Sequence, residues 1–264
     1  MSDLVSYIIP CYNSHETIAD CLTSIINQNI NATTEIIIVD SSDNVYTKEI
    51  VENYHNFNIK YLHNKRRLFA GQARNLGIIK SSGNYLALID SDIILPEDWT
   101  NVMLSHCNKI KSKKSLKVIM SGTIKNAAKT RSYLKDSLLL MLSNKYLQSK
   151  NIEYRKYLPG CNLFFEKELK KKIVFPDVVS GEDILITKKM HSENVLLALI
   201  GPNVVEHLTL KTLHQYSFEL GTSSYMLSIR GRKSEKLLLP FKLLFGSVYR
   251  LFKIVYNVIA FRFA

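Results

Sequence analysis

Glycine, proline and cysteine are all scarce in this chain. Ten glycines and six prolines among 264 residues exclude collagen-like and low-complexity proteins, and a hydrophobic content of 46% is sufficient for a folded core. The four cysteines form no CxxC pair, which argues against a zinc site and a disulfide framework and indicates buried thiols in a reducing compartment. A chain of this length forms one large α/β domain or two small ones.

The sequence also shows no recognisable targeting signal and no clear membrane-spanning segment. Met1 is followed almost at once by an apolar run at 4–9, with no basic leader and no cleavage site, so we expect residence in the cytoplasm. The most apolar stretch lies beyond Leu237. Four basic residues interrupt it, which makes it a poor membrane span.

Acidic residues are too few to balance the basic ones. The chain has 35 Lys and Arg against 23 Asp and Glu, a net charge of +12, and residues 208–264 hold nine basic side chains against two acidic ones. Beyond Pro240, the polar side chains recur every three or four residues, and nearly all others are apolar. This pattern is typical of an amphipathic helix on a lipid surface, and we expect residues 237–264 to bind the inner face of the cell membrane peripherally.

The same apolar surface allows other interpretations of the tail. It could dock against its own domain or against a second copy in a homo-oligomer. The tail lacks the polar, Arg-rich surface of proteins that track phosphates, so we expect no nucleic-acid partner.

Strand-like and helix-like segments alternate through the first 120 residues, which is the pattern of βαβ units and a largely parallel sheet. The first helix is expected to start at a capping box formed by Asn13 and Glu16. The segments expected as strands are 5–9, 35–39, 59–62, 85–89, 117–120 and 161–165. The segments expected as helices follow Asn13 and Pro96 and cover 71–80, 167–172 and 184–190.

Polar residues follow three of these strands at their carboxyl ends, where ligands bind in open parallel sheets. They are the segment 10–13, Asp40, and the run of Asp90, Ser91 and Asp92. Two carboxylates one residue apart repel each other unless a cation is present, and Mg²⁺ or Mn²⁺ combines such oxygens with substrate phosphates. The alternative is that Asp90 and Asp92 only solvate a strand end or cap the next helix.

Seven segments between residues 4 and 215 carry a further pattern. They are V-S-Y-I-I-P-C-Y-N at 5–13, E-I-I-I-V-D-S-S at 35–42, G-Q-A-R-N-L-G at 71–77, the strand into D-S-D at 82–92, G-C-N at 160–162, G-E-D at 181–183 and V-V-E-H at 204–207. In this order and spacing they resemble glycosyltransferase family 2, the inverting nucleotide-sugar enzymes of the GT-A fold. Two departures are D-S-S-D at 40–43, where the family has D-D-G-S, and lysine at 188 or 189, where it has arginine. The chain has no Q-x-x-R-W element, which argues against a processive polymer synthase.

The resemblance implies an α/β fold, with a mostly parallel GT-A sheet flanked by helices over 1–215. Residues 1–120 would bind the nucleotide sugar, 121–215 would bind the acceptor, and 216–264 would form the basic helical tail. Asp183 would act as general base and Glu182 would orient the acceptor. A divalent metal, Mn²⁺ or Mg²⁺, would be held by Asp92, Asp90 and His207. The residues implied in donor binding are Pro10, Tyr12, Asn13, Glu16, Asp40, Arg74, Asp90 and Ser91.

The expected function is transfer of a sugar from a UDP-sugar to a hydroxyl of a surface glycan or a lipid-linked saccharide. Two other classes stay open, a nucleotidyltransferase and a non-catalytic module that binds nucleotide sugars or membranes. Each site residue also has a structural alternative. Glu182 and Asp183 could only stabilise a helix N-terminus, Arg74 could be solvated, and Tyr12 or His207 could belong to the core.

Overall fold

The computed structural model describes residues 3–30, 32–114, 116–127 and 151–208. These residues belong to one structural unit. The second unit, Thr130–Leu142 and Lys211–Ala264, lies outside them, and so do the tail predicted at 216–264 and its amphipathic segment 237–264. Within the described ranges, no helix is long and apolar enough to cross a membrane.

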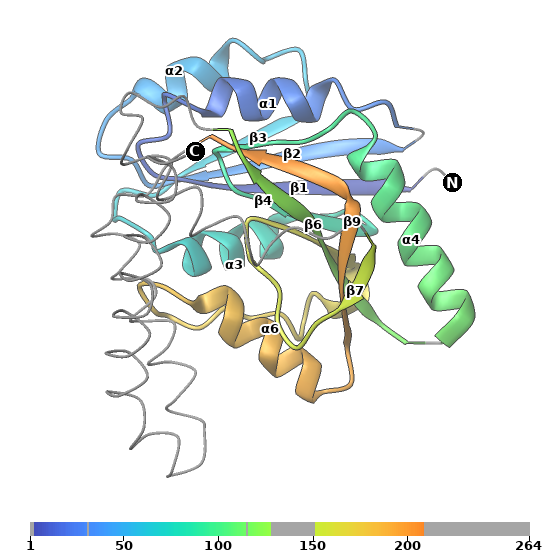
Figure 1. Ribbon diagram of the computed structural model, residues 1–264. Helices are drawn as coiled ribbons and strands as arrows, with labels where there is room; N and C mark the ends of the chain where they lie inside the picture. The colour runs from blue at the N-terminus through green and yellow to red at the C-terminus, as the bar shows by residue number, and fades with distance from the viewer. Residues whose placement is uncertain (1–2, 31, 115, 128–150, 209–264) are drawn as a thin grey trace, which may run out of the picture. The chain divides into compact units, whose positions relative to one another are not determined.

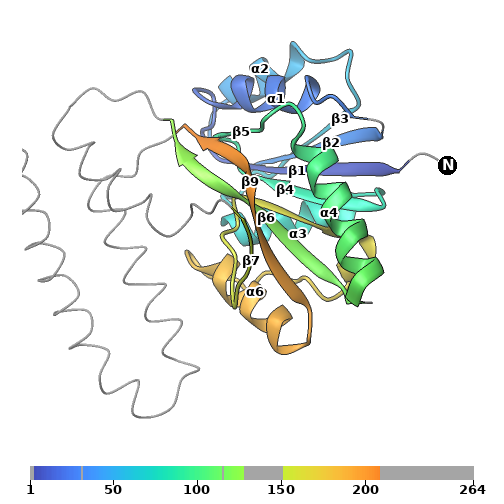
Figure 2. The ribbon, with the colours of Figure 1, turned by 45° about the vertical axis from the view of Figure 1, so that its right-hand side comes forward.

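The described unit is built on a nine-stranded sheet with helices on both faces (Figures 1 and 2). The strands are β1 Leu4–Cys11, β2 Thr33–Asp40, β3 Ile59–His63, β4 Tyr85–Ile89, β5 Ile93–Ile94, β6 Val118–Asn126, β7 Ile152–Tyr154, β8 Asn162–Glu166 and β9 Leu196–His207. The helices are α1 Ile18–Ile26, α2 Tyr46–Glu52, α3 Ala70–Lys80, α4 Trp99–Lys114 and α6 Glu182–Ser192, with a 3₁₀ turn at Lys167–Leu169. The strand order is β3-β2-β1-β4-β8-β6-β9-β5, and β7 pairs with β9.

The sheet is parallel in its first half and mixed in its second. Strands β3, β2, β1 and β4 all run parallel, as the alternation of strands and helices predicts. Strand β8 is antiparallel to both β4 and β6, and β6 and β9 are again parallel. The carboxyl ends of β1, β2 and β4 therefore lie at one edge of the sheet.

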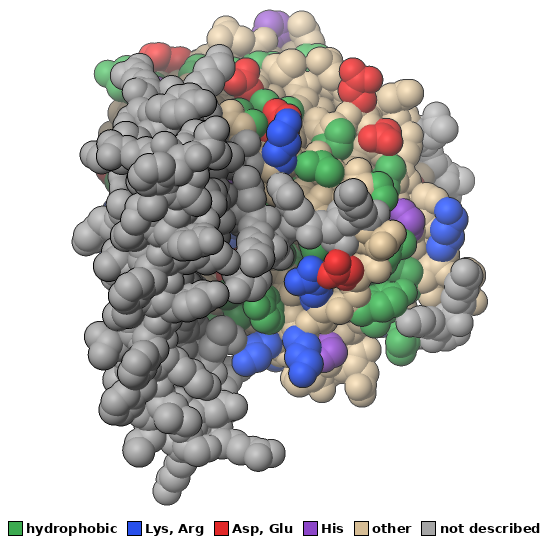
Figure 3. Space-filling view, in the orientation of Figure 1, with side chains coloured by type: hydrophobic (Ala, Val, Ile, Leu, Met, Phe, Trp, Pro, Cys, Tyr) green, Lys and Arg blue, Asp and Glu red, His purple; other side chains and the backbone are tan. Residues whose placement is uncertain are grey.

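Each face of the sheet has its own hydrophobic core, because alternate residues of a strand point to opposite faces. Side chains of both charges are visible on the outer surface of the described residues (Figure 3). Helices α1, α2 and α4 cover one face with residues such as Leu22, Val51 and Met103. Helices α3 and α6 cover the other face with residues such as Ala73 and Met190. All four cysteines are buried and free, as predicted.

Helix α1 begins later than the capping pattern predicts. It starts at Ile18, and Thr17 before it makes no side-chain capping bond. Asn13 has a left-handed φ of 51°, and its side chain accepts a hydrogen bond from the Asn44 amide instead. The predicted capping box of Asn13 and Glu16 is therefore wrong, because the chain makes a turn at 14–17 before the helix starts.

The helix predicted at 167–172 is also wrong, since only a 3₁₀ turn forms at Lys167–Leu169. Leu169 and Ile173 are buried in the same hydrophobic core as Ala73 and Ile78 of α3. Pro176 follows, and its ring disfavours helical backbone in the preceding residue. The short elements α2, β5 and β7 were not predicted.

Gly77 allows helix α3 to lie directly on β1. A Cβ atom at this position would lie 2.3 Å from Cγ2 of Ile8, which is fully buried. We expect Gly77→Ala to lower the free energy of unfolding by about 1–3 kcal/mol in urea denaturation, because overpacking outweighs alanine's better helix propensity. Ile79→Ala, at a 69% exposed position of the same helix, is the matched control and should stay within about 0.5 kcal/mol. Equal stability of Gly77→Ala and the wild type would contradict the prediction.

Candidate active site

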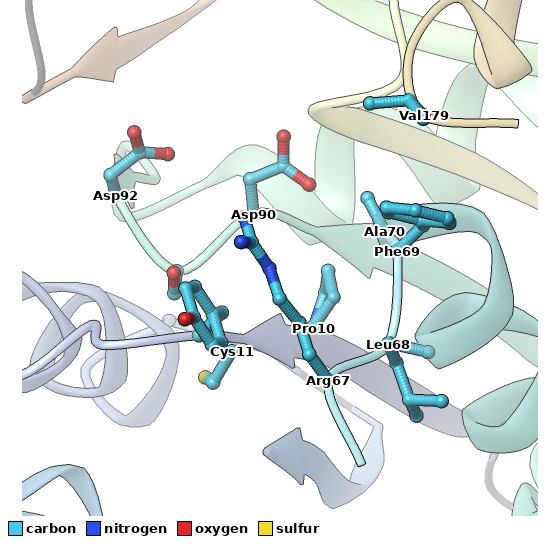
Figure 4. Close-up of a pocket in the computed structure, with 12 residues that line it drawn as sticks. Pro10, Cys11, Arg67, Leu68, Phe69, Ala70, Asp90, Asp92 and Val179 are labelled. Carbon is cyan, nitrogen blue, oxygen red and sulfur yellow. The ribbon is translucent and has the colours of Figure 1, made fainter. Parts of the chain in front are cut away.

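A pocket of about 300 Å³ lies where β1 and β4 end (Figure 4). One wall comes from the end of β1, one from the turn after β4, and one from the segment that leads into α3. The lining residues are Pro10, Cys11, Tyr12, Arg67, Leu68, Phe69, Ala70, Ala73, Asp90, Ser91, Asp92 and Val179.

Tyr12 is held in place on two sides. Its hydroxyl donates a hydrogen bond to Oδ2 of Asp43 at 2.9 Å, and the guanidinium carbon of Arg67 lies 4.2 Å from its ring centroid. The neighbouring backbone is fixed as well, because the Asn13 N–H donates to Oγ of Ser42 at 2.7 Å. Tyr12 thus presents a fixed aromatic ring in the pocket, while Asn13 is exposed beside it.

Asp40 lies behind this loop and does not line the pocket. It is fully buried, and its Oδ1 accepts hydrogen bonds from the backbone N–H and hydroxyl of Ser42 at 2.8 and 2.5 Å. Its Oδ2 accepts one from the Tyr61 hydroxyl at 2.5 Å. Burial, and next the Asp40 carboxylate, raise the pKa of Tyr61, so that hydroxyl remains a donor. Both oxygens of Asp40 thus accept hydrogen bonds from the protein, and its role in donor binding stays a prediction.

A buried arginine joins two of the predicted site carboxylates. Arg74 is 3% exposed, with Nη2 lying 2.5 Å from Oδ1 of Asp90 and Nη1 lying 2.6 Å from Oε1 of Glu182. Burial acts to lower the pKa of Arg74, but the two carboxylates outweigh it and raise that pKa. Burial raises the pKa of Glu182, and Arg74 opposes this shift. The structure therefore pairs Arg74 with Glu182 inside the protein, and their roles toward donor and acceptor stay predictions.

The residue after Arg74 fastens helix α3 to the loop that leads into α6. The Asn75 amide donates to the Phe175 carbonyl at 2.9 Å, and its oxygen accepts the Phe175 N–H at 2.8 Å. Gly71 permits the close approach, because a Cβ there would lie 3.1 Å from Cβ of Phe175 and 3.2 Å from Cγ of Glu182. The sequence analysis did not predict that Asn75 joins these two segments, although Asn75 is part of the A-R-N motif at 73–75.

Asp183 stands in the first turn of α6, with both carboxylate oxygens bound to backbone N–H groups. Oδ2 accepts from Gly160 at 2.8 Å and Oδ1 accepts from Ile184 at 2.7 Å. A Cβ at Gly160 would lie 2.7 Å from Cβ of Asp183, so glycine is required for this approach. Burial raises the pKa of Asp183, while Arg74 and the two N–H groups act to lower it. The result is a fixed carboxylate with a greater affinity for protons than an ordinary aspartate.

Asp92 and His207 are brought together by the pairing of β5 with β9. Ile93 lies opposite His207 in this ladder, and Nε2 of His207 lies 3.6 Å from Oδ2 of Asp92. Across the described residues, no group of three His, Cys, Asp or Glu side chains is arranged to hold a metal ion. An oxygen and a nitrogen donor still fit Mg²⁺ or Mn²⁺, because such ions take further ligands from water and substrate phosphates.

The remaining predicted residues divide between the pocket and the exposed surface. Pro10 and Ser91 line the pocket, and the Ser91 hydroxyl lies 2.8 Å from that of Ser14, which joins the ends of β1 and β4. Glu16 is exposed on the turn before α1 and does not line the pocket.

Sequence reasoning missed Arg67 as a pocket residue. The signal was the basic run K-R-R at 65–67, which follows the predicted strand 59–62. That strand, β3, is parallel to its neighbour β2, so its carboxyl end faces the same edge of the sheet.

Sequence comparisons identify relatives of this chain. Residues 6–171 match the profile of Glycosyl transferase family 2. The chain is 26% identical over 205 residues to an Escherichia coli protein named UDP-Glc:alpha-D-GlcNAc-diphosphoundecaprenol beta-1,3-glucosyltransferase WfgD, covering 74% of this chain and 73% of that protein. It is 32% identical over 105 residues to glycosyltransferase GlyG of Streptococcus pneumoniae, covering 39% of this chain and 35% of GlyG. The match thus spans about a third of the length of GlyG.

Two solved structures share the fold. The S. aureus TarS 1-349 structure in complex with UDP-GlcNAc superposes with a TM-score of 0.60 at 18% identity, covering 91% of this chain and 71% of that chain. The structure of GalNAc-T7 with UDP, GalNAc and Mn²⁺ superposes with a TM-score of 0.64 at 16% identity, covering 80% of this chain and 44% of that chain. The predicted α/β sheet of GT-A type flanked by helices is confirmed, with the mixed strand directions described above.

Proposed function

The chain belongs to glycosyl transferase family 2 and is a glycosyltransferase, and we propose that it transfers the sugar of a UDP-sugar to an acceptor hydroxyl with inversion at the anomeric carbon. The observation that carries this proposal is the position of Asp183. Asp183 lies at the start of α6, where the positive charge of Arg74 acts on its carboxylate. Arg74 also forms an ion pair with Asp90, one of the two carboxylates that follow β4. The donor class is supported by the E. coli relative, whose name specifies UDP-Glc, and by the UDP-GlcNAc in the TarS structure.

On the donor side, the Tyr12 ring would stack on the base, with Pro10 and Ser91 as further walls of the pocket. Asp92 and His207 would hold a divalent cation, and Asp90 at the same edge would face the ribose or the cation. Such an ion stabilises negative charge on the departing diphosphate. Arg74 supports this arrangement by keeping the Asp90 carboxylate fixed.

On the acceptor side, Asp183 would take the proton of the attacking hydroxyl. The new bond forms from that oxygen to the anomeric carbon, while the bond from this carbon to the diphosphate oxygen breaks and its electron pair leaves with UDP. Attack opposite the leaving group inverts the anomeric centre. Glu182 acts through Arg74 as a positioning residue, because their ion pair fixes the first turn of α6.

The acceptor we propose is a lipid-linked saccharide, by analogy with the diphosphoundecaprenol-linked sugar in the name of the E. coli relative. A cytoplasmic enzyme bound at the inner face of the membrane through residues 237–264 would meet such an acceptor. That location, and the use of the same segment in a homo-oligomer, stay predictions from the sequence.

A screen of nucleotide sugars for slow hydrolysis tests the donor and the metal together. We expect UDP release from one UDP-sugar with Mn²⁺ or Mg²⁺, and a fall of at least about 100-fold with a chelator or in Asp92→Ala. Asp20→Ala, at an exposed position of α1 outside the pocket, is the control and should behave as the wild type. Full activity of Asp92→Ala with a chelator present would refute the metal site. Pyrophosphate release would indicate a nucleotidyltransferase, and binding without turnover would indicate a non-catalytic module.

A further inference from the structure

Arg67 reaches into the donor pocket from the segment between β3 and α3. Its guanidinium carbon lies 4.2 Å from the Tyr12 ring centroid, and both side chains line the pocket. Figure 4 shows the Arg67 side chain extending toward Asp90 and Asp92. The site assigned above gives this residue no role.

Arg67 is the basic side chain among the residues that line the pocket. The charged residues beside it in the lining, Asp90 and Asp92, are acidic. Arg74 cannot supply positive charge there, because it is 3% exposed and both its Nη atoms bind carboxylates. Arg67 takes part in no ion pair within the described part of the chain. Among the described residues, its guanidinium therefore lies against the Tyr12 ring and is not neutralised by a carboxylate.

The backbone around Arg67 is fixed while its side chain is exposed. The Asn64 N–H donates to the Asp40 carbonyl at 2.8 Å, and the Arg66 N–H donates to Oδ1 of Asn64 at 3.1 Å. On the other side, the Phe69 N–H donates to Oε1 of Gln72 at 2.9 Å. The side chain can therefore change its contacts without movement of the segment that carries it.

We propose that Arg67 leaves the Tyr12 ring when the donor's base stacks there, and then binds the diphosphate. This inference rests on the proposed UDP-sugar donor. A planar guanidinium suits both positions, because it stacks on aromatic rings and makes paired hydrogen bonds to phosphate oxygens. The contact with an aromatic ring at an exposed position is the weaker of the two, so the exchange favours the diphosphate.

Calorimetric titration of the full chain with UDP and with uridine tests this role. Uridine carries the base without the diphosphate, so the two ligands separate the two contacts. In Arg67→Ala, we expect UDP to bind about 10- to 100-fold more weakly, as for loss of a charged hydrogen-bonded contact. Uridine should bind as well as to the wild type or more tightly, because the ring face is no longer covered. Arg66→Ala, at the exposed neighbour outside the pocket lining, should change neither affinity.

Three outcomes would overturn the inference. The first is unchanged UDP affinity in Arg67→Ala. The second is an equal loss of UDP and uridine affinity, which would mean that Arg67 only supports the Tyr12 ring. The third is a wild type that binds no UDP, which would overturn the proposed donor as well. An unchanged thermal unfolding midpoint of Arg67→Ala would show that the variant is folded.

Discussion

Asparagine in place of Asp183 is expected to lower the rate of sugar transfer by about 10²- to 10⁴-fold, the range typical for loss of a general base. The amide has nearly the same shape as the carboxylate but cannot accept the proton of the acceptor hydroxyl. Transfer to the acceptor should fall while UDP affinity stays close to that of the wild type, because Asp183 does not line the donor pocket. Product formation at saturating UDP-sugar, together with calorimetric titration of UDP, measures both quantities.

The pH dependence of the wild type gives a second measurement of the same role. A general base works in its deprotonated form, so activity is lost as the pH falls through its pKa. Since burial raises the pKa of Asp183, the acidic limb of kcat/KM should begin at a higher pH than for an ordinary aspartate of about 3.9. Asp177→Asn, at an exposed position before α6, should change neither the transfer rate nor the pH at which the acidic limb of kcat/KM begins. An active Asp183→Asn enzyme would eliminate Asp183 as the base.

Methionine in place of Arg74 is expected to destabilise the protein by about 3–5 kcal/mol, because it leaves buried carboxylates without their partner. Glu182 is the main one, since it is 8% exposed and its pKa is already raised by burial. Transfer should be lost too, because the ion pair that fixes the first turn of α6 disappears. Urea denaturation measures the free energy of unfolding. In the variant this free energy should rise again as the pH is lowered, because the unpaired carboxylate of Glu182 is then protonated.

Two comparisons separate this effect from a general weakness of α3. Lys80→Met removes a cation from an exposed position of the same helix and should change stability by no more than about 0.5 kcal/mol. Arg74→Lys keeps the charge and should recover part of the stability, but not the two-sided hydrogen bonding of the guanidinium. If Arg74→Met were as stable as Lys80→Met, the buried ion pairs would not hold the site together.

The sheet could be predicted because its signals are local. Strand-like apolar segments that alternate with helix-like segments predicted β1 to β4. The helical spacing of apolar residues predicted the face of α1 on which Leu22 and Ile25 are buried. Strand-end polarity likewise indicated Tyr12, Asp90 and Asp92, all of which line the pocket. These predictions needed only the period of a strand or helix and the rule that parallel strands present their carboxyl ends together.

The rest of the site depends on contacts between distant parts of the sequence. Arg74 and Glu182 are 108 residues apart, and no local pattern indicates that they pair. Asp40 follows a strand as a binding residue would, but no local pattern indicates that the Tyr61 hydroxyl of the neighbouring strand donates to it. A sequence shows which side chains reach an edge of the sheet. It does not show which of them neutralise one another there.

The double hydrogen bond between Asn75 and Phe175 bears on how this protein can be recombined with its relatives. A chimaera joined near residue 120 would take α3 from one parent and the loop before α6 from the other. Residues that contact each other in this protein, including Gly71 with Phe175 and Arg74 with Glu182, would then come from different parents. Helix α3 and residues 160–192 should therefore be moved together in such a chimaera, although the two segments are far apart in the chain. A chimaera that tests the proposed acceptor site should follow the same rule.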